Sequence, residues 1–275
     1  MSEAPRPSRF CIVYDCLYPW TIGGGERWYR NLALALAEAG HEVTYLTLTQ
    51  WDADNEPDLP GVRVVAVGPR LALYANGKRR IWPPLRFGIG VFAHLLRHGR
   101  RYDRVHTASF PFFSLLAAAI ARPIGRYTIA VDWLEVWSRS YWAEYLGRLG
   151  QVGWWVQRLC AAVPQTAYSF SELHRSRLGA IGYRGRSVLL PGMYGGGAHT
   201  PLPRAAPATI VYAGRFIAEK RLALLVEALA VAMQAHPGLR ATLFGQGPST
   251  RASPSRSRGW ASPTASRCRA SSRKA

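Results

Sequence analysis

Two cations in residues 209–233 have the types and the spacing that could bind an anion. Arg215 follows a short apolar run that Gly214 ends, and Lys220 stands five positions further along. A guanidinium can form two parallel hydrogen bonds with phosphate oxygens, and an ammonium adds a compact charge. Apolar residues then recur at helical spacing, which predicts a strand, a loop and a helix with Lys220 in its first turn. The free amides of a helix start also favour anions, so the pattern indicates a phosphate site. The alternative is a solvated surface on which Glu219 neutralises its neighbours.

The segment AGRFIAEKR, residues 213–221, resembles the donor-binding signature of the retaining family-4 glycosyltransferases, which have the GT-B fold. In that family an Arg and a Lys five positions apart hold the diphosphate of a nucleotide-sugar. The resemblance therefore implies that Arg215 and Lys220 bind the donor diphosphate. It also implies sugar transfer with retention and without a metal or another cofactor.

Three consecutive glycines, residues 23–25, lie between a predicted strand over residues 10–15 and a predicted helix over residues 26–39. Glycine lets the backbone approach a ligand closely, and a helix start offers free N–H groups. The segment also resembles the first strand-to-helix turn of the same family. That resemblance implies that Gly23 and Gly24 border the donor phosphates and the acceptor.

A dinucleotide site is an alternative for the same turn, with Asp52 or Asp54 as the acid that binds a ribose. The spacing argues against it, because GGGERW does not fit the pattern GxGxxG. The preceding Pro-Trp-Thr-Ile also makes the loop longer than the tight turn that this fingerprint requires.

Two further candidates stand where predicted strands end. His106 closes the strand expected over residues 101–107, and Asp132 follows the strand expected over residues 126–131. Ligands of open α/β sheets bind outside the carboxyl ends of the strands. From residue type alone His106 can equally be structural, but the resemblance implies that it lies beside the transferred sugar. Asp132 precedes many aromatic residues between positions 133 and 155, which indicate helix packing or an acceptor wall, and it is our acceptor-side candidate.

The order of the elements predicts an α/β protein. Residues 1–190 contain seven short apolar runs separated by helical patterns, which is typical of a Rossmann-like, doubly wound parallel sheet. We predict that this is the acceptor-side domain. Gly and Pro are dense over residues 191–207, which indicates a linker. Residues 208–248 then begin a second Rossmann-like domain, which would bind the nucleotide-sugar.

The family pattern stops after residue 248. Residues 249–275 contain one large apolar side chain, Trp260, and are mostly Ser, Arg and Ala, a composition that predicts a disordered basic tail. Family members continue with a pair of glutamates spaced Glu-x7-Glu, but no acidic residue follows Glu227 here. The resemblance therefore implies an incomplete, truncated second domain.

Composition limits the remaining possibilities. The chain has 275 residues and a net charge of +19, of which residues 249–275 carry seven positive charges. We attribute the rest to an anionic donor and to peripheral contact with anionic lipid at the inner face of the membrane, and we expect no specific nucleic-acid partner. The four cysteines lack CxxC spacing, which predicts free thiols and no metal site. No apolar run is long enough to span a bilayer, so we expect a cytoplasmic protein.

These observations predict a nucleotide-sugar-dependent glycosyltransferase, similar to hexosyltransferases, with a lipid, glycan or small-molecule acceptor. The alternative is a non-catalytic N-terminal domain that binds an acceptor, a partner or an anionic membrane surface.

Overall fold

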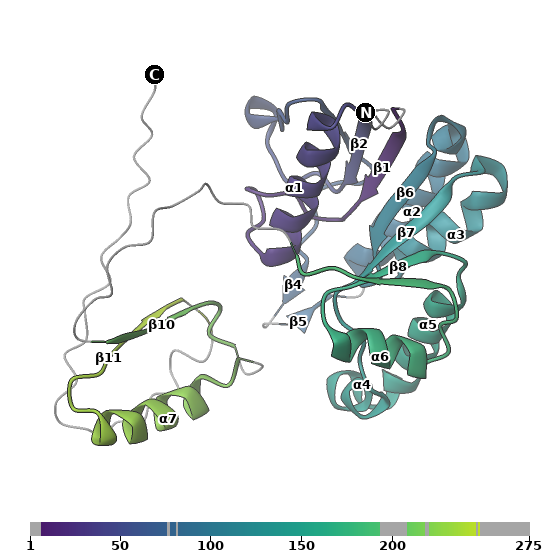
Figure 1. Cartoon of the computed structure of the whole chain (residues 1–275). Helices are drawn as coiled ribbons and strands as arrows, with labels where there is room; N and C mark the ends of the chain where they lie inside the picture. Colours follow the sequence, from purple (N-terminus) through teal and green to yellow (C-terminus); the bar gives the residue numbers. More distant parts are fainter. Residues whose placement is uncertain are drawn as a thin grey trace, which may run out of the picture. The chain divides into compact units, whose positions relative to one another are not determined.

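The structure is a computed structural model that describes residues 7–75, 78–80, 82–192, 208–217, 220–245 and 247. The chain divides into two units, Met1–Gly197 and Ala198–Ala275 (Figure 1). The predicted tail, residues 249–275, and most of the predicted linker lie outside the described residues.

The first unit contains a parallel sheet in the strand order β3-β2-β1-β6-β7-β8-β9 (Figure 1). Each strand matches one of the seven apolar runs, which confirms the predicted α/β class. The strands, in that order, are Val62–Ala66, Glu42–Thr47, Arg9–Val13, Arg104–Ala108, Thr128–Trp133, Thr166–Ser169 and Arg186–Leu189. A short antiparallel pair, β4 (Tyr74–Ala75) and β5 (Lys78–Arg79), precedes α2.

Six α-helices connect these strands. They are α1 (Gly24–Glu38), α2 (Trp82–His98), α3 (Phe113–Gly125), α4 (Arg139–Leu146), α5 (Gly150–Ala162) and α6 (Glu172–Ala180), with 3-10 turns η1 (Ala53–Asn55), η2 (Gly99–Arg101) and η3 (Gly147–Leu149). The first of them begins two residues earlier than predicted, so it includes two of the three glycines. Within the described residues, no helix is long and apolar enough to cross a membrane.

Hydrophobic side chains cover both faces of the sheet. Ile12 and Val13, which are consecutive in β1, belong to different clusters, as the alternation of a strand requires. Tyr29 of α1 packs in the cluster of Ile12. Phe87 of α2 and Leu115 of α3 pack in the cluster of Val13. The first helix therefore covers one face of β1, and α2 and α3 cover the other.

Three of the four cysteines lie in this core. Cys11, Cys16 and Cys160 are buried thiols that form no disulfide among the described residues, as predicted, whereas Cys268 lies outside the described residues. Burial raises the pKa of the Cys11 and Cys160 thiols, so both stay uncharged and unreactive at neutral pH.

Gly90 lets α2 approach the loop after β3. A methyl group at this position would overlap the backbone carbonyl of Val67. We therefore expect Gly90→Ala to lower the free energy of unfolding by about 1–3 kcal/mol. Gly179 of α6 is the matched control, because a methyl group there would meet no atom within 4 Å. Gly179→Ala should instead stabilise the protein by about 0.5–1 kcal/mol through helix propensity. Equal effects of the two substitutions in urea unfolding would contradict the close approach.

His94 on α2 makes the stability of the fold depend on pH. Its Nε2 lies 2.8 Å from the hydroxyl of Tyr102. Burial, and to a smaller extent the charges of His98, Arg63 and Arg101, together lower the pKa of His94 to about 4. Since the folded pKa lies below the unfolded value of about 6.5, this contribution is complete above pH 6.5. It is lost as the pH falls towards 4.

We therefore expect acidification from pH 7 to pH 4.5 to remove about 1 kcal/mol of stability through His94, after allowance for the solvent exposure of the ring. His94→Gln should reduce the pH dependence of unfolding by that amount, because glutamine does not titrate in this range. Parallel pH profiles for the two proteins would exclude this role.

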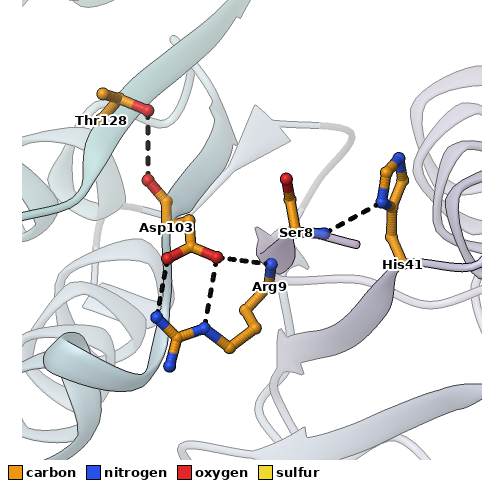
Figure 2. Close-up of polar contacts among 5 residues, drawn as sticks. All are labelled: Ser8, Arg9, His41, Asp103 and Thr128. Atoms are coloured by element: carbon orange, nitrogen blue, oxygen red, sulfur yellow. Dashed lines mark hydrogen bonds and ion pairs between the residues drawn. The ribbon is translucent and has the colours of Figure 1, made fainter. Parts of the chain in front are cut away.

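The amino ends of the strands are joined by polar contacts among Ser8, Arg9, His41, Asp103 and Thr128 (Figure 2). Arg9, the first residue of β1, donates its backbone N–H to the Asp103 carboxylate at 2.8 Å. Its guanidinium donates to both carboxylate oxygens, at 3.2 and 2.7 Å. The hydrogen bonds from Arg9 lower the pKa of the Asp103 carboxyl. Thr128 of β7 donates to the Asp103 carbonyl, and the Ser8 N–H donates to His41 Nδ1. These contacts fix β1, β6 and β7 at the edge opposite the candidate site.

The second unit contains a parallel strand–helix–strand motif. Its elements are β10 (Thr209–Ala213), α7 (Leu222–Ala235) and β11 (Arg240–Phe244). The prediction that Lys220 lies in the first turn of the helix is wrong, because α7 begins at Leu222. The residue before it, Arg221, has φ 49° and ψ 46°, and this left-handed conformation separates Lys220 from the helix.

Candidate functional site

The strand order of the first unit reverses between β1 and β6. The chain leaves β1 through α1 to reach β2 on one side, and it leaves β6 through α3 to reach β7 on the other. Open α/β sheets bind their ligands at such a switch point, outside the carboxyl ends of the strands. The predicted residues of this unit lie at that edge: Gly23 and Gly24 start α1, His106 lies in β6, and Asp132 lies in β7.

The structure brings His106 and Asp132 together. His106 Nε2 lies 2.8 Å from Asp132 Oδ1, and the Trp28 indole N–H donates to Asp132 Oδ2 at 2.7 Å. Asp132 is 0% exposed and His106 is 8% exposed. Both carboxylate oxygens are thus occupied by donors inside the protein. Sequence reasoning did not identify Trp28, because its partner is 104 positions away.

Aromatic rings hold His106 in one orientation. The Tyr168 ring stacks on it, with centroids 5.7 Å apart and planes 12° apart, and the Tyr29 ring meets it edge-on at 6.2 Å. Burial raises the pKa of Tyr29 well above its usual value, and the charge of Asp132 raises it further, so Tyr29 stays neutral. The Tyr29 hydroxyl makes no well-formed hydrogen bond to any described residue.

The contact with Asp132 determines which nitrogen of His106 is available. A carboxylate accepts, so Nε2 carries the proton that it donates, and Nδ1 of a neutral ring is then an acceptor. Among the described residues, the hydrogen bond of His106 runs through Nε2 and leaves Nδ1 available. The pair can therefore present a fixed imidazole acceptor to a ligand hydroxyl at the edge of the sheet.

The glycines at the start of α1 differ in the space around them. A side chain at Gly23 would overlap the Glu26 carboxylate, and one at Gly25 would overlap the Tyr14 hydroxyl, whereas one at Gly24 would meet nothing within 4 Å. Glu26 is 8% exposed, so a carboxylate already lies at the positive end of this helix. Of the two predicted glycines, Gly24 is therefore the one that leaves room for a ligand.

The two predicted phosphate ligands lie in the second unit. Arg215 follows β10, and Lys220 precedes α7, and both side chains are exposed. The Tyr212 hydroxyl donates to the Arg215 carbonyl at 3.2 Å, and the Lys220 N–H donates to the Ile217 carbonyl at 3.0 Å. Neither cationic group has a hydrogen bond or an ion pair with a described residue, so both can bind an anion from solution.

Most of the aromatic residues after Asp132 pack inside the protein. Trp133 and Trp142 are buried, and Trp137 contacts the rings of Tyr141, Trp142 and Tyr145. Helix packing therefore accounts for Trp133 and Trp137, whereas Trp155 is 65% exposed.

The sequence of the first unit determines the family. The glycosyl transferase 4-like domain matches residues 23–192. The chain belongs to this family. The match includes the turn with Gly23 and Gly24, His106 and Asp132, and it confirms the family to which the sequence is similar. No curated protein sequence matches the chain.

Solved structures show that this glycosyl transferase 4-like chain has the fold of GT-B glycosyltransferases. A sucrose-phosphate synthase from Thermosynechococcus elongatus matches 88% of this chain with a TM-score of 0.62 and 18% identity. HepE from Anabaena, in complex with UDP and glucose, matches 89% with a TM-score of 0.58 and 15% identity. The catalytic domain of starch synthase IV from Arabidopsis thaliana, bound to ADP and acarbose, matches 89% with a TM-score of 0.56 and 13% identity.

The chain spans only part of the length of these relatives. The chain covers 63% of the sucrose-phosphate synthase, 63% of HepE and 69% of the starch synthase domain. At sequence identities of 18%, 15% and 13%, the structural similarity shows a shared fold.

Proposed function

We propose that this chain binds a nucleotide-sugar and transfers its sugar to an acceptor hydroxyl with retention of configuration. The observation that carries the proposal is the buried His106–Asp132 pair, 2.8 Å apart, at the edge where the strand order reverses. A family match over residues 23–192 supports the reaction class. Two of the solved relatives contain UDP or ADP, which makes a nucleoside diphosphate the natural ligand to test.

Each residue has a distinct role in this proposal. His106 accepts a hydrogen bond from a hydroxyl of the transferred sugar, and Asp132 is a positioning residue that fixes the imidazole. Arg215 and Lys220 bind the donor diphosphate and stabilise the negative charge that develops on it as the glycosidic bond breaks. Gly24 borders the bound donor. The acceptor is a lipid, a glycan or a small molecule, and no metal takes part in these steps.

A screen with UDP-, GDP- and ADP-glucose tests the proposal directly. One of the three should raise the midpoint of thermal unfolding in a concentration-dependent manner, since a ligand of the folded state stabilises it by mass action. Release of the nucleoside diphosphate should then follow when an acceptor mixture is added. Stabilisation without release would favour the non-catalytic alternative, a domain that binds an acceptor, a partner or an anionic membrane surface. No stabilisation by any of the three would contradict donor binding.

Gly24 allows a test in which folding and ligand binding are separate. Gly24→Ala should leave the free energy of unfolding within about 1 kcal/mol of the original, because the added methyl group meets no protein atom within 4 Å. It should weaken binding of the stabilising nucleotide-sugar by about tenfold or more, because a close backbone approach is lost. Unchanged affinity, measured by calorimetry, would remove Gly24 from the site.

A further inference from the structure

An apolar cavity lies beside the loop that follows β6. It has a volume of about 180 Å3, and it is enclosed by that loop, by the starts of α2 and α3, and by α4 and α5. The side chains that define its character are Phe110, Phe112, Trp142, Tyr145, Leu149 and Val152. Apolar cavities of similar size stay dry and take up apolar ligands. At about 30 Å3 for each small group, this cavity has room for about six methylene-sized groups.

The cavity opens through apolar surface. Leu149 and Val152 line it, yet they are 58% and 59% exposed, so they form its rim. The exposed apolar surface continues along α5 with Trp155, which is 65% exposed. A polar ligand such as a free sugar gains nothing from this entrance. An alkyl chain gains about 25 cal/mol for each Å2 of apolar surface that leaves water.

One cation lies at the cavity. Of the described residues that line it, Arg80 alone is charged, and its side chain is exposed. A guanidinium at the edge of an apolar cavity complements a molecule that has an apolar chain and an anionic, phosphate-like head. The lining therefore matches both parts of an anionic lipid.

A single loop connects the cavity to the His106–Asp132 pair. Ser109 directly follows β6, and its N–H donates to the Asp132 carbonyl at 2.9 Å. Phe112 then donates its N–H to the Ser109 carbonyl at 2.8 Å and contributes its ring to the cavity. Phe112 has φ 60° and ψ −41°, a conformation that is strained for a residue with a large side chain. Such strain is kept where surrounding contacts fix it, and it often marks ligand sites.

We propose that this cavity binds the alkyl chain of an anionic lipid, with Arg80 at its phosphate. The proposal rests on the proposed function in one respect, since it makes a hydroxyl of this lipid's headgroup the acceptor of the transferred sugar, with the nucleoside diphosphate leaving and taking the hydroxyl proton. The alkyl chain of the lipid enters between Leu149 and Val152. The headgroup stays at the surface, on the side of the sheet edge where β6 ends.

The test uses the full chain, with butyl, hexyl, octyl and dodecyl phosphate as probes in calorimetry below their micelle-forming concentrations. Affinity should rise by about fourfold for each methylene up to about six carbons and more slowly beyond, because the cavity is then full. Inorganic phosphate should compete only weakly, because it can contact Arg80 but gains nothing from the apolar cavity. Competition by inorganic phosphate as strong as that by hexyl phosphate, or an affinity independent of chain length, would mean a phosphate site alone and would overturn the proposal.

Three variants with a matched control locate the binding. Val152→Asp places a charge at the rim, and Val156→Phe fills the cavity. Each substitution should weaken the binding of hexyl phosphate by at least tenfold. Arg80→Gln should weaken it about three- to tenfold, as expected for a lost charged hydrogen bond. Leu159→Asp is the control, because this residue is exposed on the same helix and does not line the cavity.

An equal loss of hexyl phosphate binding in Leu159→Asp and Val152→Asp would indicate adsorption on the outer surface of α5 and would contradict binding in the cavity. Retained binding by both Val152→Asp and Val156→Phe would overturn it as well. Nucleotide-sugar binding, measured on the same samples, keeps the two proposals separate. A protein that binds nucleotide-sugar and no alkyl phosphate contradicts only the lipid site.

Discussion

Asp132→Ala is expected to lower the free energy of unfolding by about 2–5 kcal/mol. The substitution removes the acceptor for two buried donors, His106 Nε2–H at 2.8 Å and Trp28 Nε1–H at 2.7 Å. A buried donor that loses its partner costs about 1–3 kcal/mol, and the cavity left by the carboxylate adds to this. Urea unfolding followed by circular dichroism measures the change.

Asp132→Asn distinguishes the structural role from the positioning role. Asparagine keeps the size and one acceptor oxygen, so it should cost less stability than alanine. It cannot accept from both donors, so the imidazole loses its fixed proton position, and sugar transfer should fall more than 100-fold, by analogy with other oriented histidines. Transfer by Asp132→Asn at the original rate would show that Asp132 does not position His106. A cost below 1 kcal/mol for Asp132→Ala would contradict the buried pair itself.

The second large effect is expected at Arg215 and Lys220. Each replacement by alanine should weaken nucleotide-sugar binding by about 10- to 100-fold, because a charged hydrogen bond to phosphate contributes about 1.5–3 kcal/mol. The double variant should show no binding. Stability should hardly change, since both side chains are exposed and have no partner among the described residues.

Arg240→Ala is the matched control for this pair. Arg240 is exposed and has the same charge, but it stands at the amino end of β11, away from the end where Arg215 follows β10. If Arg240→Ala weakens donor binding as much as Lys220→Ala does, the overall positive charge of the unit rather than a diphosphate site explains the binding. Calorimetry at two salt concentrations completes the comparison, because long-range attraction is screened by salt.

The elements of the fold follow from local pattern. Seven apolar runs became seven strands because a parallel sheet buried on both faces needs continuous apolar segments. The sequence does not show which distant residues lie close together in space. His106 and Asp132 were each placed at a strand end, but their contact depends on which strands are neighbours and on side-chain alternation within them.

Other features depend on single backbone conformations. The start of α7 was misplaced because Arg221 adopts a left-handed conformation that its residue type does not indicate. The role of Trp28 depends on the path of α1 across the sheet. The apolar cavity arises from imperfect packing among four helices and a loop, and no periodicity in the sequence encodes a void.

The two units differ in how their strands are protected. In the first unit, β1 pairs with a strand on each side, and Cys11, Ile12 and Val13 are 0% exposed. Among the described residues of the second, β10 pairs with β11 alone, and Val211 and Phe244 are 61% and 58% exposed. Backbone amides of β10 should therefore exchange their hydrogens with deuterated water far sooner than those of β1, through local opening that leaves the first unit intact. A bound nucleotide-sugar would slow this exchange selectively.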